Sequence, residues 1–245
     1  MSLELSAEQL LENWNKLIGY IPQYFEGERK EKLTEMYNHF QDRMMYAPAS
    51  GREHYHNAFP GGYIEHILHV IKCSQKVGQL WKDMGAHINW TDEELIFSAM
   101  HHDLGKVGSL EGDYYVPNDS EWHRKNQGKI YNHNGNIHYM NVTDRSFFLL
   151  NHFQVPMTEQ EFLAIKLTDG LYEEANKGYL MTYMDDFQLK TNLPTILHQG
   201  DMMASKLEYE EWKYNHSSED YVTKAKKKEE LTDSQSKVFN DLFGS

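Results

Sequence analysis

Three helix starts can be located from one motif, a serine or threonine followed three residues later by glutamate or glutamine, ahead of an apolar run. The pairs are Ser6 with Gln9, Thr91 with Glu94, and Thr158 with Glu161. In such a capping box, two side chains satisfy backbone N–H groups that the first helical turn leaves without partners. Apolar residues spaced three and four apart predict further helices over 27–45, 63–84 and 146–153. We therefore expect an all-α helical bundle.

Residues 108–140 interrupt this pattern. They are rich in glycine, asparagine, aspartate and tyrosine, and the stretches DYYV and KIYN suit either a short hairpin or an irregular excursion. Long ordered insertions in helical domains are often functional. A helix is again expected over 161–179.

We expect one globular unit with three parts. N-terminal helices over 1–45 pack on a core domain at 46–212, and 213–245 form a tail with a short closing helix. The run KAKKKEE at 224–230 suits a solvated helix face or a mobile tail better than a phosphate-binding patch.

Charge and composition limit the classes of molecule that the protein can bind. A formal net charge of −13 argues against a broad contact with duplex nucleic acid, which requires clustered lysine and arginine. The sequence has neither an apolar run of 18 residues nor a signal peptide, and its single cysteine, Cys73, excludes an internal disulfide. We expect a soluble, cytoplasmic protein without a membrane partner.

Polar side chains on apolar helices indicate a metal site. His66 lies among aliphatic residues, and His102 and Asp103 follow an apolar helix at its C-terminal end, where the partial negative charge disfavours a carboxylate. Gly105 is the expected C-cap of that helix. Asp201 lies within another apolar helix, expected over 193–209, where an ionised carboxylate needs a partner. Taken by itself, His66 could equally be a buried histidine that hydrogen-bonds to a backbone carbonyl. The positive charge of Lys106 could likewise compensate the negative charge of Asp103 without a metal.

Taken together, His66, His102, Asp103 and Asp201 offer two imidazole nitrogens and two carboxylates. This mixture suits a divalent Mn, Fe, Co, Ni or Mg ion better than structural zinc, which favours thiolates. A bound metal can lower the pKa of its water from about 15.7 to as little as about 7 and can neutralise phosphate charge.

The ordered pattern H…HDxGK…D, formed by these four residues with Lys106, resembles the HD superfamily of metal-dependent phosphohydrolases over residues 46–210. The preceding stretch APASGREHYHNAFPGGYIEHILHV is similar to a subgroup that includes exonucleases and conjugation-linked proteins. The resemblance implies an HD-type helical domain in which the four residues hold one metal and a bound water attacks phosphorus. Asp103 and Lys106 are then the catalytic candidates.

Many members of the superfamily bind a second metal through two more histidines. Here His133 and His138 precede the next expected helix, but Thr168 and Asp169 stand where the pattern A-I-x-x-H would place a histidine. We expect one tightly bound metal, with His133, His138 and Asp169 as candidate ligands of a weaker second ion. His101 points about 100° away from His102 around the helix and is expected to support the site indirectly.

Six residues are candidates for binding the substrate, although each also has a structural interpretation. His56 could act beside the metal or be an ordinary loop residue. Lys106 and Arg145 could bind a phosphate group or form local ion pairs, and the two tyrosines could stack on a nucleotide base or simply pack in the fold. The candidates are His56, Lys106, Arg145, Tyr172, Asn176 and Tyr179, the last three expected on one helix face.

The expected function is hydrolysis of a phosphate ester or anhydride on a small nucleotide. Acidity and a helical pocket favour a small metal-chelated substrate over a polymer. Three alternatives remain: a 3′-5′ exonuclease acting on single strands, a di-iron HD-type oxygenase, and a non-catalytic metal-binding module. The absence of a histidine at Thr168 weighs against the oxygenase.

Overall fold

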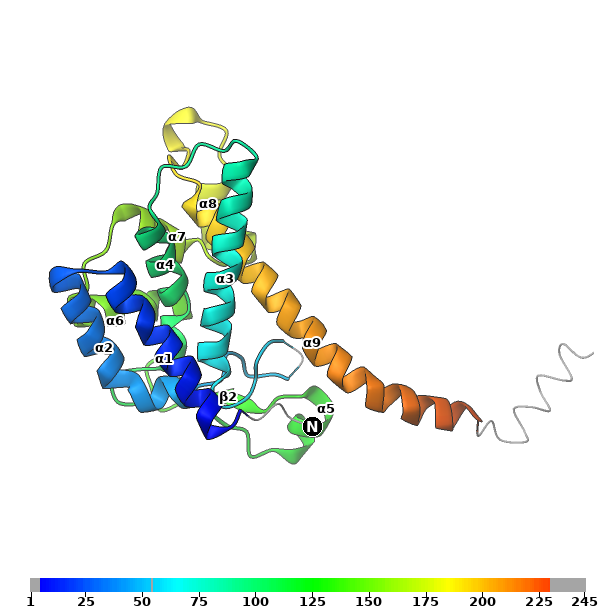
Figure 1. Ribbon diagram of the computed structural model, residues 1–245. Coiled ribbons are helices and arrows are strands. Elements are labelled where there is room, and N and C mark those ends of the chain that lie inside the picture. The colour runs from blue at the N-terminus through cyan, green and yellow to red at the C-terminus, as the bar shows by residue number, and fades with distance from the viewer. Residues whose placement is uncertain (1–4, 54, 230–245) are drawn as a thin grey trace, which may run out of the picture.

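The computed structural model describes residues 5–53 and 55–229. The closing helix expected over 231–244 lies outside this range. In the described part, helices form a bundle and the single sheet has two short strands, so the expected all-α fold is confirmed (Figure 1). No helix in these residues combines the length and apolarity needed to cross a membrane.

The bundle is organised around α3 (Gly62–Asp83), which packs against four other helices. These are α1 (Ala7–Tyr24), α2 (Gly27–Tyr46), α4 (Asp92–His101) and α9 (Leu193–Glu229). One hydrophobic cluster joins them, with Leu17, Phe40, Ile67, Phe97 and Ile196 all at most 1% exposed. The N-terminal helices therefore share the core of the central helices.

The helix starts follow from their caps. All three expected capping boxes are present, at the first residues of α1, α4 and α7 (Glu159–Lys166). α6 (Val142–His152) begins at Asn141, whose side chain accepts from the Asp144 N–H, so it starts four residues earlier than expected.

The insertion contains the hairpin that the sequence allowed. β1 (Tyr115–Pro117) pairs antiparallel with β2 (Tyr131–His133), and a short helix, α5 (Glu121–Gln127), lies between them. The Gly51 carbonyl accepts from the backbone N–H groups of Ile130 and Tyr131, so the insertion is held against the loop that leads into α3.

The ends expected for α4 and α7 were also wrong. Gly105 does not cap α4; it lies within a 3-10 turn, η1 (Leu104–Val107), against α6, where a Cβ would come within 2.1 Å of the Val142 carbonyl oxygen. The expected helix over 161–179 ends at Lys166, because the chain turns through Gly170 at a φ of +53°. Short turns follow: η2 (Gly170–Tyr172), η3 (Glu174–Asn176), α8 (Lys177–Leu180) and η4 (Asp185–Phe187).

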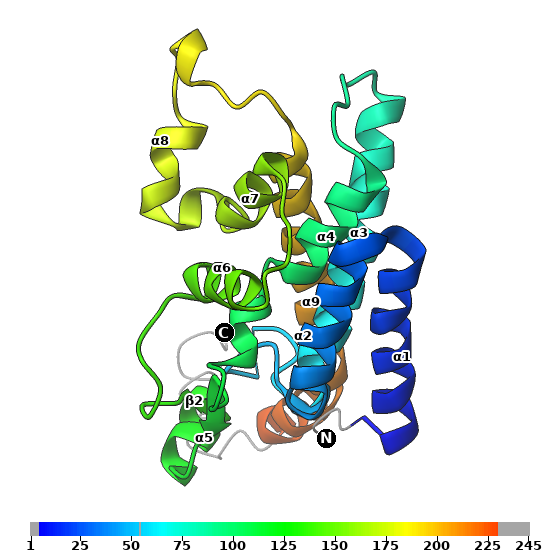
Figure 2. The same cartoon turned by 90° about the vertical axis from the view of Figure 1, so that its left-hand side faces the viewer.

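α9 is much longer than the helix expected near 193–209. It crosses α3 and then projects beyond the bundle, so the boundary expected at 212/213 falls inside a continuous helix (Figure 1). The insertion and the α8 segment lie at opposite ends of the molecule (Figure 2). The metal-ligand candidates lie between these ends, along α3, α4 and α9.

Candidate metal centre

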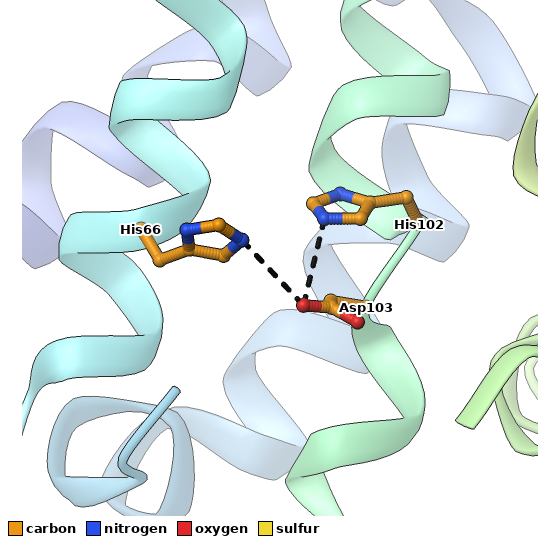
Figure 3. Close-up of side chains that lie close together, drawn as sticks. All are labelled: His66, His102 and Asp103. Carbon is orange, nitrogen blue, oxygen red and sulfur yellow. Dashed lines mark ion pairs between the residues drawn. The ribbon is translucent and has the colours of Figure 1, made fainter. Parts of the chain in front are cut away.

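His66 from α3 and the pair His102 and Asp103 at the end of α4 point toward one another (Figure 3). The Nε2 atoms of His66 and His102 lie 3.6 and 3.5 Å from Asp103 Oδ2. Both imidazoles are 1% exposed, and the Asp103 side chain is 13% exposed. Their ligand atoms all lie within 4.8 Å of one another, so this buried group can hold a metal ion.

Asp201 joins the group from α9. Its Oδ1 lies 3.3 Å from His66 Nε2 and 3.8 Å from His102 Nε2. Two atoms that each bind one ion at about 2.1 Å are about 3.0 Å apart at a right angle and about 4.2 Å apart on opposite sides. The four nitrogen–oxygen separations fall between these limits, so Asp201 adds a carboxylate from a third segment of the chain to the group of His66, His102 and Asp103.

Hydrogen bonds orient both imidazoles for coordination. His102 Nδ1 donates to the Ala99 carbonyl at 2.9 Å, and His66 Nδ1 donates to the Glu208 carboxylate at 3.0 Å. Each Nε2 therefore faces the carboxylates and can bind a cation once it carries no proton, the arrangement typical of metal-binding histidines. His102 Nε2 is buried without a hydrogen-bond partner among the described residues, as expected of a metal ligand.

Glu208 is a functional residue that the sequence did not reveal. It is 3% exposed and also accepts from His69 Nδ1 at 2.8 Å. Burial opposes its ionisation, but the imidazoles of His66 and His69 lower the pKa of Glu208 to about 2. The available signal was spacing: Glu208 follows Asp201 by seven residues, about two helical turns, and so lies on the same face of α9.

The carboxylates in and around this group stabilise the positively charged forms of His66 and Lys106. Burial alone would lower the pKa of His66, yet Glu208 and Asp201 raise it to about 10. Lys106 Nζ lies 2.6 Å from Asp103 Oδ2, and this ion pair raises the pKa of Lys106 despite its burial. Asp103, although buried, has a lowered pKa because of Lys106 and the two imidazoles, so it remains ionised.

His56 lies directly beside the metal group. Its ring packs on His66, with centroids 4.7 Å apart, and its Nε2 is buried without a partner among the described residues. Burial, reinforced by Lys106 and His66, lowers the pKa of His56 to about 3, so the imidazole is neutral. His56 also lines a cavity of about 630 Å³ that Asp201 borders.

The three candidate ligands of a second ion lie apart from one another. His133 is on β2 with its ring against Tyr114, and His138 is exposed before α6. Asp169 lies at the cavity, where burial and the carboxylates of Asp103 and Asp201 raise its pKa. Within the described residues, the one compact group of three or more potential ligands is His66, His102 and Asp103.

The remaining substrate candidates do not share one helix face. Arg145 is 2% exposed, and its Nη2 donates to the His138 carbonyl at 2.6 Å, so it supports the chain before α6. Asn176 is buried and donates to the Gly170 carbonyl, whereas Tyr172 is 86% exposed at the cavity. The expectation of one face was wrong because the helix ends at Lys166. Tyr179, on α8, is 42% exposed.

His101 is buried on a different face of α4 from His102, against Tyr37 and Phe97. Its Nδ1 donates to the Phe97 carbonyl at 2.7 Å, and its Nε2 lies 3.4 Å from the Tyr37 hydroxyl. The first of these contacts lies within α4 and the second joins α4 to α2, and neither involves any of the four metal-ligand candidates.

Comparisons of the chain with protein-family models, curated proteins and solved structures find no match. A functional assignment therefore depends on the geometry and chemistry of the buried group.

Proposed function

We propose that the chain is an HD-type, metal-dependent phosphohydrolase that cleaves a phosphate ester or anhydride of a small nucleotide. The observation that carries the proposal is the convergence of His66, His102, Asp103 and Asp201, with Nε2 of each imidazole facing the carboxylates. Two histidines and two carboxylates suit a six-coordinate divalent ion such as Mn²⁺ and leave positions for water and substrate.

The residues around the ion would have the following roles. When bound, the ion supplies a Lewis acid and lowers the pKa of its water. Glu208 fixes the tautomer and orientation of His66 through Nδ1. Lys106 keeps Asp103 ionised, and its ammonium can hold a non-bridging phosphate oxygen at the edge of the site.

Support for a small substrate comes from the cavity and the charge. A volume of about 630 Å³ lies within the range of about 300 to 1,000 Å³ typical of small-molecule sites. The net charge of −13 disfavours a polyanionic polymer. The proposal includes the cytoplasm as the compartment where such nucleotides are available.

The test is phosphate release from a panel of nucleoside mono-, di- and triphosphates and single-stranded oligonucleotides, with Mn²⁺, Mg²⁺, Fe²⁺, Co²⁺ and Ni²⁺. We expect about one metal per chain and hydrolysis of at least one nucleotide. Asp103→Asn should lose both the bound metal and turnover, whereas Asp42→Asn, which changes an exposed carboxylate on α2, should lose neither.

Three results would reject the proposal in different ways. Full activity of metal-free protein would exclude the metal mechanism. Stepwise release of nucleotides from a 3′ end would identify an exonuclease instead. Oxygen consumption by iron-loaded protein without phosphate release would identify an oxygenase.

A further inference from the structure

The cavity beside Asp201 is built from three separate segments. His56 comes from the loop before α3, Thr168 and Asp169 come from the turn after α7, and Met202 and Tyr209 come from α9. Aromatic and thioether side chains therefore border the same space as polar groups. This combination suits a ligand with one flat apolar part and several hydrogen-bonding atoms.

Two residues that line this cavity, His56 and Thr168, each have a polar atom without a partner among the described residues. His56 Nε2 and Thr168 Oγ1 are both buried, and neither has a hydrogen-bond partner within the described part of the chain. Thr168 as a whole is 3% exposed. Buried polar groups are nearly always paired, so a ligand that reaches these two atoms would gain hydrogen bonds that the described protein leaves unmade.

The turn that carries Thr168 is held in place by α9. His198 Nδ1 donates to the Thr168 carbonyl at 2.6 Å, and the His198 ring lies against Gly170. A Cβ on Gly170 would come within 2.6 Å of that ring, and the residue adopts a φ of +53°, which favours glycine. His198 is thus a positioning residue that fixes Thr168 and Asp169 at the cavity.

The charges at the cavity limit how many phosphate groups it can accept. The carboxylates of Asp169 and Asp201 border it, and Lys206 is the one lysine or arginine among the described residues that do so. A monophosphate placed at the metal centre meets the ion and the nearby Lys106. A triphosphate adds two phosphate groups, which would have to pass the Asp169 carboxylate with little further positive charge to stabilise them.

From these contacts we infer that the cavity binds the nucleoside part of a nucleoside monophosphate, with His56 and Thr168 as its specificity-determining hydrogen-bonding residues. The position of the phosphate rests on the function proposed above, whereas binding of the nucleoside part does not. The substrate bond is then an ester rather than an anhydride.

The first test measures binding of nucleosides, which contain no phosphate, to Mn²⁺-loaded protein by calorimetry. At least one common ribo- or deoxyribonucleoside should bind. Thr168→Val, which removes the hydroxyl at nearly constant shape, and His56→Phe, which keeps a ring beside His66, should each weaken this binding about tenfold or more. Thr34→Val, on an exposed face of α2, should leave it unchanged.

The second test compares mono- and triphosphate analogues in which methylene groups replace the ester and bridging oxygens. The triphosphate analogue should bind at least tenfold more weakly, and Asp169→Asn should reduce that difference. Absence of nucleoside binding, unchanged affinity in Thr168→Val, or a triphosphate analogue that binds as tightly as the monophosphate would each overturn the inference.

Failure of the inference can be told apart from failure of the proposed function. Nucleoside binding without phosphate release from any nucleotide would reject the hydrolase and leave the binding site intact. Phosphate release at equal rates from nucleotides and from simple phosphate esters would support the hydrolase and reject the nucleoside site.

Discussion

Glu208 is a residue outside the metal group on which the geometry of that group depends. Its carboxylate accepts from His66 Nδ1 and His69 Nδ1, and this contact keeps His66 Nε2 directed at Asp103 and Asp201. Carboxylates that bind the outer nitrogen of a metal-bound histidine typically contribute 10- to 100-fold in metal affinity.

We therefore expect Glu208→Gln to weaken Mn²⁺ binding about 10- to 100-fold, because an amide neither carries the charge nor fixes the tautomer of His66. Competition with a coloured chelator measures this affinity. Glu211→Gln, one turn further along α9 at an exposed position, is the control and should bind metal normally. Equal affinities in the two variants would refute the role of Glu208.

Arg29 is a residue on which the stability of the fold depends. Its guanidinium binds the fully buried Glu161 carboxylate at 2.6 Å and Glu93 at 2.9 Å, and it lies over the Phe97 ring. Arg29→Ala leaves the Glu161 carboxylate buried without its cation and should lower the free energy of unfolding by about 3 to 5 kcal/mol. Lys16→Ala, which breaks an exposed pair with Glu12, should cost at most about 1 kcal/mol.

The loss in Arg29→Ala should depend on pH. Burial raises the pKa of Glu161 even beside Arg29, and removing the guanidinium raises it further. The folded variant then holds a proton that the unfolded chain releases, so protonation favours the fold. Urea unfolding should therefore show the smallest deficit below the usual carboxyl pKa and a growing deficit as the pH rises. A deficit that is constant with pH would contradict this explanation.

The four ligand candidates could be recognised in the sequence because each is a polar residue surrounded by aliphatic ones. Glu208 could not be recognised in this way, because it lies in the stretch SKLEYEEWKY, whose other charged residues make it look like a solvated helix face. Its burial depends on the position of α3 across the interface, which no local pattern encodes. Thr168 was noted only as a missing histidine, and His198 was not singled out.

At the scale of elements, two glycines inside helices provide a matched pair. Gly19 in α1 has open space around it, whereas a Cβ on Gly200 in α9 would come within 2.1 Å of Ser74 Oγ on α3. Gly19→Ala should raise the free energy of unfolding by about 0.5 to 1 kcal/mol, since alanine favours helix. Gly200→Ala should lower it by about 1 to 3 kcal/mol, since α3 and α9 must separate.

Chemical denaturation of both variants measures these opposite changes. Each variant controls for the other, because the substitution and the secondary structure are the same and only the surroundings differ. Changes of equal sign would mean that the close approach of α3 and α9 at Gly200 does not limit their packing.

Helix starts were the most predictable elements, because a capping box is a local chemical signal in the sequence. Helix ends were less predictable. Gly105 looked like a cap but allows close contact between η1 and α6, and the end of α7 depends on the turn through Gly170. α5 was not predicted, since it is a seven-residue helix with no buried residues that begins at the Ser120 cap.

At the scale of the whole molecule, an ion at this site would connect α3, α4 and α9. An ion that binds only the folded protein stabilises it by about 2.7 kcal/mol at a concentration one hundred times its Kd. For a chain of this size, that corresponds to a rise in Tm of about 5 to 10 °C. Mn²⁺ should produce this rise and a chelator should reverse it, as measured by calorimetric scanning.

Asp103→Asn should abolish the metal-dependent rise in Tm while the fold remains helical by circular dichroism. A rise of the same size in Asp103→Asn would mean that the ion binds elsewhere. No rise in the native chain at saturating Mn²⁺ would mean that the four side chains do not form a metal site.

The position of Asp201 on α9 also sets an order of events during biosynthesis. A ribosome releases His66, His102 and Asp103 well before α9 emerges, so the growing chain has an incomplete ligand set and an α3 surface without its covering helix. N-terminal parts of a nascent chain begin to fold first. On the function proposed above, metal capture is therefore among the last steps of maturation, and we expect a translation product that stalls before Leu193 to remain a substrate for chaperones and proteases.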